Sequence, residues 1–348
     1  MHTSRQKSST PLRIAINGFG RIGRMIVRAL IERHITDIDV VAINDLAPLE
    51  TNIHLLQWDS IHGPLSHPII SGGSSGDNWM DFGYGRTHVF REKDPARLPW
   101  ADLSVDLVLE CSGVFTAREK VALHLQAGAK RVLVSAPADG ADVTVVYGVN
   151  HTQIQPNHLI LSNASCTTNC LAPIACVLHR GIGILAGHVT TVHAFTSDQS
   201  LHDRAHRDLA RARAATLAMV PTLTGAAKAI GLVLPELHGK LEGTAIRVPT
   251  ANVSLIDFVF NAARPTSREE VNVLMVEASG QDALRGVLSI NTLPLVSVDF
   301  NHNPASAIFD VQQTQVLAGS LVRVLAWYDN EWGFANRMVD VSSFIRTL

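Results

Sequence analysis

One cysteine in this sequence lies among small polar residues that could make its thiol a nucleophile. Residues 162–169 read Ser-Asn-Ala-Ser-Cys-Thr-Thr-Asn; they follow an apolar strand pattern at 159–161 and open a helical pattern. The first turn of a helix leaves backbone N–H groups unpaired and carries partial positive charge, which favours a thiolate and stabilises an oxyanion beside it. We therefore predict that Cys166 is a nucleophile, with a buried structural cysteine as the alternative.

A histidine in a strand-like run could serve as the base that this thiol needs. His193 ends the run Val-Thr-Thr-Val-His at 189–193, far enough downstream for a helix to end and a strand to return alongside. A Cys–His pair of this kind favours the thiolate–imidazolium form and supplies acid–base catalysis. We predict that His193 is the acid–base partner of Cys166.

A glycine-rich turn near the start of the sequence indicates a dinucleotide site. An apolar strand at 12–16 leads into Gly-x-Gly-x-x-Gly at 18–23, a helical pattern follows, and a second apolar strand at 40–43 ends close to Asp45. Glycines let the backbone approach a pyrophosphate at the helix N-terminus, and an acidic residue about 20 residues later can accept the ribose hydroxyls. Because its carboxylate would repel a 2′-phosphate, we predict NAD as the cofactor. The residues predicted to bind it from this turn are Asn17, Gly18, Gly20, Arg21, Ile22, Gly23 and Asp45.

The elements that would position these residues differ between the two halves of the sequence. Continuous apolar strand patterns such as 131–135 and 143–146 are typical of a parallel sheet covered on both faces. After Cys166 the strand patterns are longer and alternate, as at 187–195 and 251–260. The sequence therefore predicts an α/β protein: a Rossmann-type dinucleotide-binding domain followed by an α+β catalytic domain with a mixed, largely antiparallel sheet.

Length and composition limit the possible partners. The 348 residues exceed what one hydrophobic core usually organises, so we expect two domains. With 29 Lys+Arg against 31 Asp+Glu, the net charge of −2 gives no general attraction to nucleic acid or to a membrane surface, and we expect neither partner. Four cysteines without an apolar leader favour a reducing compartment, so we expect the cytoplasm. His202 and His206 stand among charged loop residues, and we predict no metal site.

Together with the cysteine octet and the glycine turn, further blocks make the sequence resemble the phosphorylating glyceraldehyde-3-phosphate dehydrogenases. The resemblance runs from about Leu12 to the C-terminus. Its most specific blocks are INGFGRIGR at 16–24, SNASCTTNC at 162–170, TLTGAAK at 222–228, RVPTAN at 247–252 and WYDNEWG at 327–333.

This resemblance implies a reaction and a set of binding residues. Cys166 would attack the aldehyde of glyceraldehyde 3-phosphate, His193 would act as acid and base, and inorganic phosphate would release an acyl phosphate. Two anion subsites follow: one for the substrate's own phosphate (Thr196 and Arg247), one for the attacking phosphate (Ser165, Thr167, Thr224 and Gly225), with Arg211 able to serve either. The resemblance adds further cofactor-binding residues, namely Lys93, Ser135 and Asn330.

The resemblance also implies a division of the chain and an oligomeric state. We expect an NAD-binding domain at 12–164, a catalytic domain at 165–328, and a C-terminal helix at 329–348 that returns to the NAD-binding domain. Before them, the polar composition of residues 1–11 predicts a disordered extension. The expected assembly is a homotetramer in which the loop 197–213 lies near a neighbouring subunit's cofactor.

Two departures and two alternative functions remain open at this point. Arg204-Ala205 stands where NAD-specific relatives tend to carry Leu-Pro, and an arginine there could tolerate a 2′-phosphate. In the same loop, Ala210-Arg211 lacks one arginine of a pair that is frequent in the family. The nearest alternative is an erythrose-4-phosphate dehydrogenase, which passes its thioester to water. A non-catalytic RNA-binding or scaffold protein is the other alternative, and it predicts a basic groove.

Overall fold

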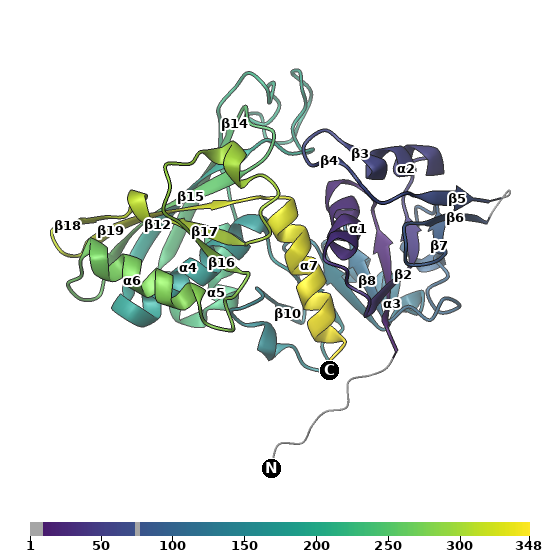
Figure 1. The fold of residues 1–348 in the computed structure, drawn as a ribbon, viewed down its shortest axis with the longest axis horizontal. Helices are drawn as coiled ribbons and strands as arrows, with labels where there is room; N and C mark the ends of the chain where they lie inside the picture. Colours follow the sequence, from purple (N-terminus) through teal and green to yellow (C-terminus); the bar gives the residue numbers. More distant parts are fainter. Residues whose placement is uncertain (1–9, 74–76) are drawn as a thin grey trace, which may run out of the picture. The chain divides into compact units, whose positions relative to one another are not determined.

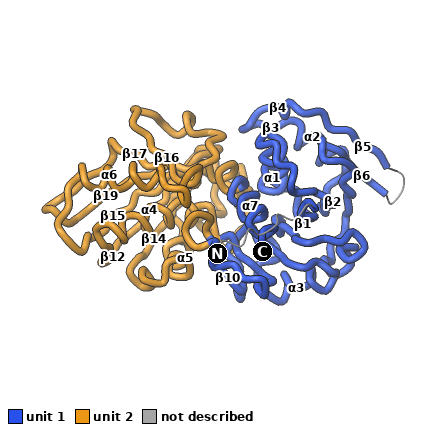
Figure 2. The backbone as a smooth tube through the Cα atoms, turned by 60° about the horizontal axis from the view of Figure 1, so that its bottom comes forward, with its two compact units in different colours: residues 1–145, 151–163, 335–348 blue, residues 146–150, 164–334 orange. Residues whose placement is uncertain are grey.

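The computed structural model describes residues 10–73 and 77–348, and these group into two compact units (Figure 2). Except for Thr10 and Pro11, the N-terminal extension expected at 1–11 lies outside the described residues. The first unit holds residues up to 145 together with 151–163 and 335–348; the second holds 146–150 and 164–334.

The first unit contains a nine-stranded sheet in the order β10-β11-β9-β8-β1-β2-β7-β6-β5, and β3 pairs separately with β4 (Figure 1). The strands of this unit are β1 (Leu12–Asn17), β2 (Ile38–Asn44), β3 (Trp58–Asp59), β4 (Gly63–Pro64), β5 (Ile70–Gly72), β6 (Asn78–Asp81), β7 (Thr87–Phe90), β8 (Leu107–Glu110), β9 (Arg131–Val134), β10 (Val143–Thr144) and β11 (Ile160–Ser162). Its helices are α1 (Arg21–Glu32), α2 (Leu49–Gln57) and α3 (Arg118–Gln126).

All strand pairs from β10 to β7 are parallel, and only β6 and β5 run antiparallel to their neighbours. The central strands β1, β2 and β8 are buried along nearly their whole length, because helices cover both faces of a parallel sheet. This arrangement confirms the Rossmann-type part of the predicted fold.

The second unit is built on a mixed sheet in the order β13-β14-β12-β15-β19-β17-β16, with β18 paired to β19. Most neighbours are antiparallel, and the two parallel pairs are β12 with β14 and β16 with β17. The predicted largely antiparallel sheet is therefore confirmed. Its strands are β12 (Ile184–Ala194), β13 (Val220–Leu223), β14 (Leu241–Val248), β15 (Ser254–Ala262), β16 (Leu288–Asn291), β17 (Ala307–Asp310), β18 (Gln315–Leu317) and β19 (Leu321–Tyr328).

Three helices pack on this sheet, and the central one, α4, carries the predicted nucleophile at its first residue. The helices are α4 (Cys166–Ile182), α5 (Ala226–Val233) and α6 (Arg268–Ser279). α4 contacts both other helices and several strands, and the core of the unit is formed by apolar side chains from α4 and from the inward face of β12, β15 and β19. A helix buried so extensively has a fixed position, which fixes the position of its N-terminus.

The last helix, α7 (Trp332–Ile345), begins in the second unit and continues into the first, where residues 335–348 belong. From the sequence, a C-terminal helix is expected at 329–348. Short 3-10 helices lie at Pro95–Arg97, His151–Gln153, Pro235–Leu237, Ser297–Phe300 and Val311–Gln313. Among the described residues, no helix has the length and apolar character required to cross a bilayer.

Candidate functional site

The predicted nucleophile and its predicted base are in contact. Cys166 is the first residue of α4, and the Ser165 side chain caps the helix by accepting a hydrogen bond from the Thr168 N–H at 3.1 Å. The Cys166 Sγ lies 3.5 Å from Nε2 of His193, which is buried near the end of β12. These two residues, which are distant in sequence, meet because α4 and β12 are consecutive elements that pack together.

Strand register brings Arg247 to the other nitrogen of the same imidazole. β12 and β14 are parallel neighbours, and His193 pairs directly with Arg247. The guanidinium Nη1 lies 2.7 Å from His193 Nδ1, and the Ala194 carbonyl oxygen lies at the same distance from that nitrogen. An arginine can only donate, so the Arg247 contact favours an unprotonated Nδ1 with the ring proton on Nε2, facing the sulfur. A carbonyl oxygen can only accept, so the Ala194 contact favours the opposite tautomer, with the proton on Nδ1.

The electrostatics of this cluster favour uncharged forms of both reactive groups. Burial raises the pKa of the Cys166 thiol, although the Arg247 charge and the Thr167 hydroxyl and N–H partly oppose that rise. Burial and then the Arg247 charge lower the pKa of His193 to about 3, despite its contact with the Ala194 carbonyl. These shifts favour a thiol and a neutral imidazole over the expected thiolate–imidazolium pair, because burial disfavours charge and the nearby guanidinium disfavours a second positive charge.

A tyrosine that the sequence analysis did not single out holds this cluster together. The buried Tyr328 hydroxyl lies 2.8 Å from Thr167 Oγ1 and 2.9 Å from Thr191 Oγ1, and its ring meets the His193 ring edge-on at 5.9 Å between centroids. It therefore ties α4, β12 and β19 at the site. Tyr328 lies in the block WYDNEWG at 327–333, from which only Asn330 is named as a site residue on the sequence alone.

The residues expected at the anion subsites lie in the second unit, in different states of engagement. Arg247 is half-buried, and its Nε has no hydrogen-bond partner among the described residues. Arg211 is already committed, because it contacts Asp198 at 2.7 Å and the Thr222 hydroxyl at 3.0 Å. Arg247 is thus the cation with the larger unused capacity for an anion.

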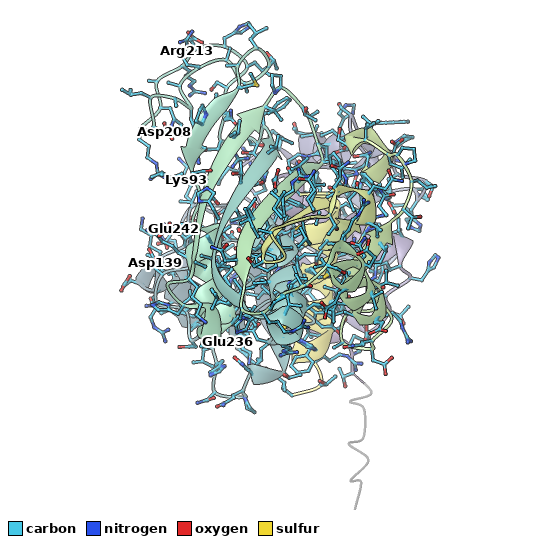
Figure 3. The ribbon with its side chains drawn as sticks, turned by 90° about the vertical axis from the view of Figure 1, so that its left-hand side faces the viewer. Lys93, Asp139, Asp208, Arg213, Glu236 and Glu242 are labelled. Carbon is cyan, nitrogen blue, oxygen red and sulfur yellow. The ribbon has the colours of Figure 1, made fainter. Side chains whose placement is uncertain are left out.

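The remaining anion-site residues are divided between helix ends and the loop that joins β12 to β13. Thr196 lies near the start of that loop, whose residue Arg213 lies beyond one end of the sheet, at the end away from Glu236 (Figure 3). Thr224 accepts a hydrogen bond from the Ala226 N–H at 3.2 Å, and Gly225 precedes α5 with open space where a side chain would be. The Thr167 hydroxyl points to Tyr328 in the core.

The first unit contains a pocket of about 390 Å³ at the carboxyl ends of its parallel strands. Five predicted cofactor residues line it: Asn17, Gly18, Gly20, Asp45 and Lys93. The lining residues that sequence reasoning missed are Asn44, Leu46, Glu92, Cys111, Ser112, Val114 and Phe115. These come from the ends of β2, β7 and β8, which the sequence does not mark as belonging to one site.

The glycines of the turn have different roles in this pocket. Gly18 has φ of +90°, and a Cβ there would lie 2.5 Å from the Ser112 backbone, so only glycine fits. Gly23 lets α1 approach the strand, since a Cβ would lie 2.4 Å from the Gly18 carbonyl oxygen. At Gly20, by contrast, a side chain would meet open space, as expected where a ligand approaches the helix N-terminus.

Other predicted cofactor residues lie beside the pocket or elsewhere. Arg21 forms an ion pair with the buried carboxylate of Asp59, and Ile22, Gly23 and Ser135 are likewise outside the pocket lining. Ser135 nevertheless hydrogen-bonds the thiol of Cys111, which does line it. Asn330 lies in the second unit, where its side-chain oxygen accepts a hydrogen bond from Ser254 at 2.8 Å.

The pocket fits a dinucleotide. A glycine backbone opens onto it at the start of α1, so unpaired N–H groups of the helix can bind a pyrophosphate. Asp45 Oδ1 and Oδ2 accept the Ala47 and Phe19 N–H groups at 2.8 and 2.7 Å, which fixes the carboxylate at the pocket wall. A fixed carboxylate suits ribose hydroxyls and opposes a 2′-phosphate.

Comparisons with known proteins agree with both units. Residues 12–118 match the family model described as glyceraldehyde 3-phosphate dehydrogenase, NAD binding domain, and residues 165–330 match its C-terminal domain. The chain is 58% identical over 331 residues to a glyceraldehyde-3-phosphate dehydrogenase of Cereibacter sphaeroides and equally to one of Xanthobacter flavus, covering 95% of this chain and 97% of each relative. A relative named likewise in Pseudomonas aeruginosa is 56% identical over 334 residues, covering 94% of this chain and 96% of its own.

The matched N-terminal model is that of an NAD-binding domain, which confirms the cofactor predicted from the glycine turn and Asp45. The two matched models and the near-complete coverage of the relatives also confirm the resemblance seen in the sequence blocks. The chain belongs to the glyceraldehyde-3-phosphate dehydrogenase family of NAD-dependent oxidoreductases.

Proposed function

We propose that the chain oxidises D-glyceraldehyde 3-phosphate and phosphorylates it to 1,3-bisphosphoglycerate, with inorganic phosphate as the second substrate. The observation that carries this proposal is the 3.5 Å contact between Cys166 Sγ and His193 Nε2 at the first turn of α4, beside the Arg247 guanidinium. A thiol, an imidazole and a cation in one cluster suit covalent catalysis on an aldehyde that carries a phosphate group.

The proposed reaction passes through two covalent states of Cys166. The thiol loses its proton and the sulfur bonds to the aldehyde carbon, giving a thiohemiacetal. NAD, when bound, supplies the hydride acceptor that turns this state into a thioester. An oxygen of inorganic phosphate then attacks the thioester carbon, the C–S bond breaks, and the acyl phosphate leaves while the thiolate is restored. Backbone N–H groups at the start of α4 stabilise the oxyanion formed in each attack.

His193 changes roles in this proposal when the substrate phosphate engages Arg247. In the resting site Arg247 donates to Nδ1, so Nε2 carries the proton and can only donate toward the sulfur. With the guanidinium drawn to an anion, Nδ1 can donate to the Ala194 carbonyl 2.7 Å away, and Nε2 becomes an acceptor. The substrate's phosphate would thus convert the imidazole into a base that takes the thiol or thiohemiacetal proton.

The two anion subsites remain as the family resemblance implies them. Arg247 and Thr196 would bind the substrate phosphate, and the unpartnered Nε of Arg247 supports its part. The residues proposed for the attacking phosphate are Ser165, Thr167, Thr224 and Gly225, with Arg211 available to either. Since the Thr167 side chain contacts Tyr328, we propose that Thr167 contributes through its backbone N–H.

We propose residues 12–164 as the NAD-binding domain, 165–328 as the catalytic domain and 329–348 as its returning helix. For the cofactor we retain all the predicted residues of the glycine turn with Lys93, Ser135 and Asn330. We also propose a cytoplasmic homotetramer. Four apolar side chains of the β12–β13 loop and β13 support self-association, because each is at least 74% exposed: Leu209, Leu217, Met219 and Leu223. Sedimentation as a monomer would contradict the tetramer.

The deciding experiment is NADH formation from glyceraldehyde 3-phosphate, with and without inorganic phosphate. We expect sustained turnover only when phosphate is present. A parallel assay with erythrose 4-phosphate tests the hydrolytic alternative, which predicts turnover without phosphate. Replacing NAD by NADP tests the departure at Arg204-Ala205. Phosphate-independent oxidation, or no oxidation of either aldehyde, would overturn the proposed function.

A further inference from the structure

A chain of buried hydrogen bonds lies at the nucleotide pocket of the first unit, and the proposed mechanism does not use it. Its centre is Glu110 at the end of β8, which is 1% exposed. One carboxylate oxygen accepts the Asn17 side-chain N–H at 2.6 Å and contacts His124 Nε2 at 2.9 Å; the other accepts the Ser112 N–H at 2.8 Å and the Ser112 hydroxyl.

His124 can meet Glu110 only as a donor. The indole N–H of Trp100 donates to His124 Nδ1 at 3.0 Å, and both rings are fully buried. An indole cannot accept a hydrogen bond, so Nδ1 has no proton and the imidazole proton lies on Nε2, toward the carboxylate. Each of these four contacts of Glu110 is therefore with a donor, and a side chain that only accepts is required there.

The chain continues across the ends of the strands to the far side of the pocket. Because the Asn17 amide gives its N–H to Glu110, its oxygen faces Asn44, whose N–H it accepts at 2.7 Å. The Asn44 amide in turn accepts the Glu92 N–H and donates to the Glu92 carbonyl oxygen, both at 2.9 Å. The orientation of both amides is thus fixed from each end, by Glu110 and by the Glu92 backbone.

We propose that Glu110 is a positioning residue for cofactor binding, held by His124 and Trp100, which sets the direction of this chain and the shape of the pocket. Four other members of the chain line the pocket: Asn17, Asn44, Glu92 and Ser112. The inference rests on the proposed use of the pocket for NAD, and it adds three buried residues that do not line the pocket.

The Glu110→Gln variant tests the acceptor requirement directly. The Gln amide has two orientations. In one, its NH₂ faces the Asn17 and His124 donors; in the other, it faces the Ser112 N–H. Asn17 cannot turn its side chain to compensate, because its oxygen accepts the Asn44 N–H. We expect NAD to bind about tenfold more weakly, since a buried donor is left unmatched. We also expect faster hydrogen exchange at the Ser112 and Glu92 amides. Glu119→Gln on α3, an exposed position, is the matched control and leaves both quantities unchanged.

A second pair of variants keeps the test valid if Glu110→Gln folds poorly. In His124→Gln the side-chain oxygen can accept from Trp100 and the NH₂ can donate to Glu110, so we expect nearly normal NAD affinity and exchange. His124→Leu can neither accept from Trp100 nor donate to Glu110, so it should weaken NAD binding and speed amide exchange. Equal behaviour of these two variants would overturn the proposal, as would wild-type NAD affinity and amide exchange in Glu110→Gln.

The two readouts separate this inference from the proposed function. NAD affinity is measured by isothermal titration, and amide exchange is measured separately. Neither measurement needs a substrate. If the wild-type chain failed to bind NAD, the proposed function would fail, whereas the exchange data would still test whether Glu110 orders the pocket. Weaker NAD binding in Glu110→Gln with unchanged exchange would overturn the positioning role, because the carboxylate would then act on the cofactor directly.

Discussion

The two units build their sites in opposite ways. In the first, backbone and short polar side chains at strand ends form the pocket, and the donors and acceptors of the chain centred on Glu110 are matched one to one. In the second, side chains from α4, β12 and β14 meet, burial favours the neutral forms of both reactive groups, and the Nε of Arg247 lacks a partner among the described residues. In the binding site, the buried hydrogen-bond donors and acceptors already have partners before a ligand arrives. In the reactive site, the protonation states of the side chains are expected to change when the substrate binds.

The largest expected effect separates the two units most sharply. Cys166→Ser should lower kcat for glyceraldehyde 3-phosphate by at least about 10³-fold, because a serine hydroxyl does not ionise near neutral pH. NAD affinity, measured by fluorescence titration, should stay within about twofold of the wild type. A variant that retained its rate, or that lost NAD binding together with its rate, would break the comparison.

Replacing the cation of the reactive cluster should have the next largest effect. Arg247→Met should lower kcat/KM by about 10²-fold, since a charge-assisted contact to the substrate is lost. The pKa of His193 should rise from about 3 but stay below its ordinary value, because burial, the larger cause, remains. In wild type the buried imidazole is thus neutral above about pH 3, and the variant should begin to protonate at a higher pH.

Nitrogen NMR of His193 measures both the pKa and the tautomer. We expect the proton on Nε2 in the wild type and on Nδ1 in Arg247→Met, where only the Ala194 carbonyl remains as a partner. Arg247→Lys, which keeps a positive charge, serves as the control. An unchanged tautomer in Arg247→Met would contradict the role assigned to the arginine.

An ion pair of the first unit should show the contrasting behaviour, in which a charge stabilises the fold. Burial raises the pKa of Asp59, but hydrogen bonds from Arg21, His62 and Ile61 outweigh it and bring the value to about 2, below the ordinary 3.8. Its contribution, about 2 kcal/mol, is present above pH 3.8 and is lost as the pH falls toward 2.

In Arg21→Met, fewer hydrogen bonds oppose the effect of burial, so the pKa of Asp59 should be higher than in the wild type. The loss of stability on acidification should therefore begin at a higher pH. Urea unfolding between pH 3 and pH 7 measures this difference. Identical pH profiles for variant and wild type would show that the pair does not stabilise the first unit. NAD affinity should be followed in parallel, since Arg21 opens the helix at the pocket.

The smallest expected effect concerns cofactor choice. Asp45→Ala should weaken NAD binding about tenfold and improve NADP binding, because the variant loses ribose hydrogen bonds and a negative charge that opposes a 2′-phosphate. Both affinities can be measured by titration. If NADP binding did not improve, the selectivity would have to come from elsewhere, and the loop residue Arg204 would be the next position to test.

Sequence reasoning succeeded where chemistry and geometry are local in the chain. The strand, glycine turn, helix and Asp45 lie within one βαβ unit, so their spacing alone fixes the geometry, and the family comparison confirms the NAD-binding domain. The change from continuous to alternating apolar strands likewise predicted both sheets correctly, because burial on two faces or on one face is written into each strand.

The rest depended on contacts between elements that are distant in sequence. Strand order, which local patterns do not encode, sets the pocket residues that follow β7 and β8, the Tyr328 hydroxyl contacts and the Glu110 chain. The charge state of the Cys166–His193 pair was expected from residue types alone. Burial in the folded chain favours the neutral forms instead, and the register of β12 and β14 adds the Arg247 charge against the imidazole. Burial and a neighbouring charge are properties of the folded chain.

That shared register of His193 and Arg247 limits how the enzyme can be redesigned. In the proposed mechanism, any replacement at 247 chosen to admit an aldehyde without a phosphate also removes a donor to Nδ1 of the His193 ring. In that mechanism, substrate range and proton transfer cannot be changed independently of each other. A redesign for neutral aldehydes would need a second cation or a new donor to the His193 ring, introduced together with the change in the pocket.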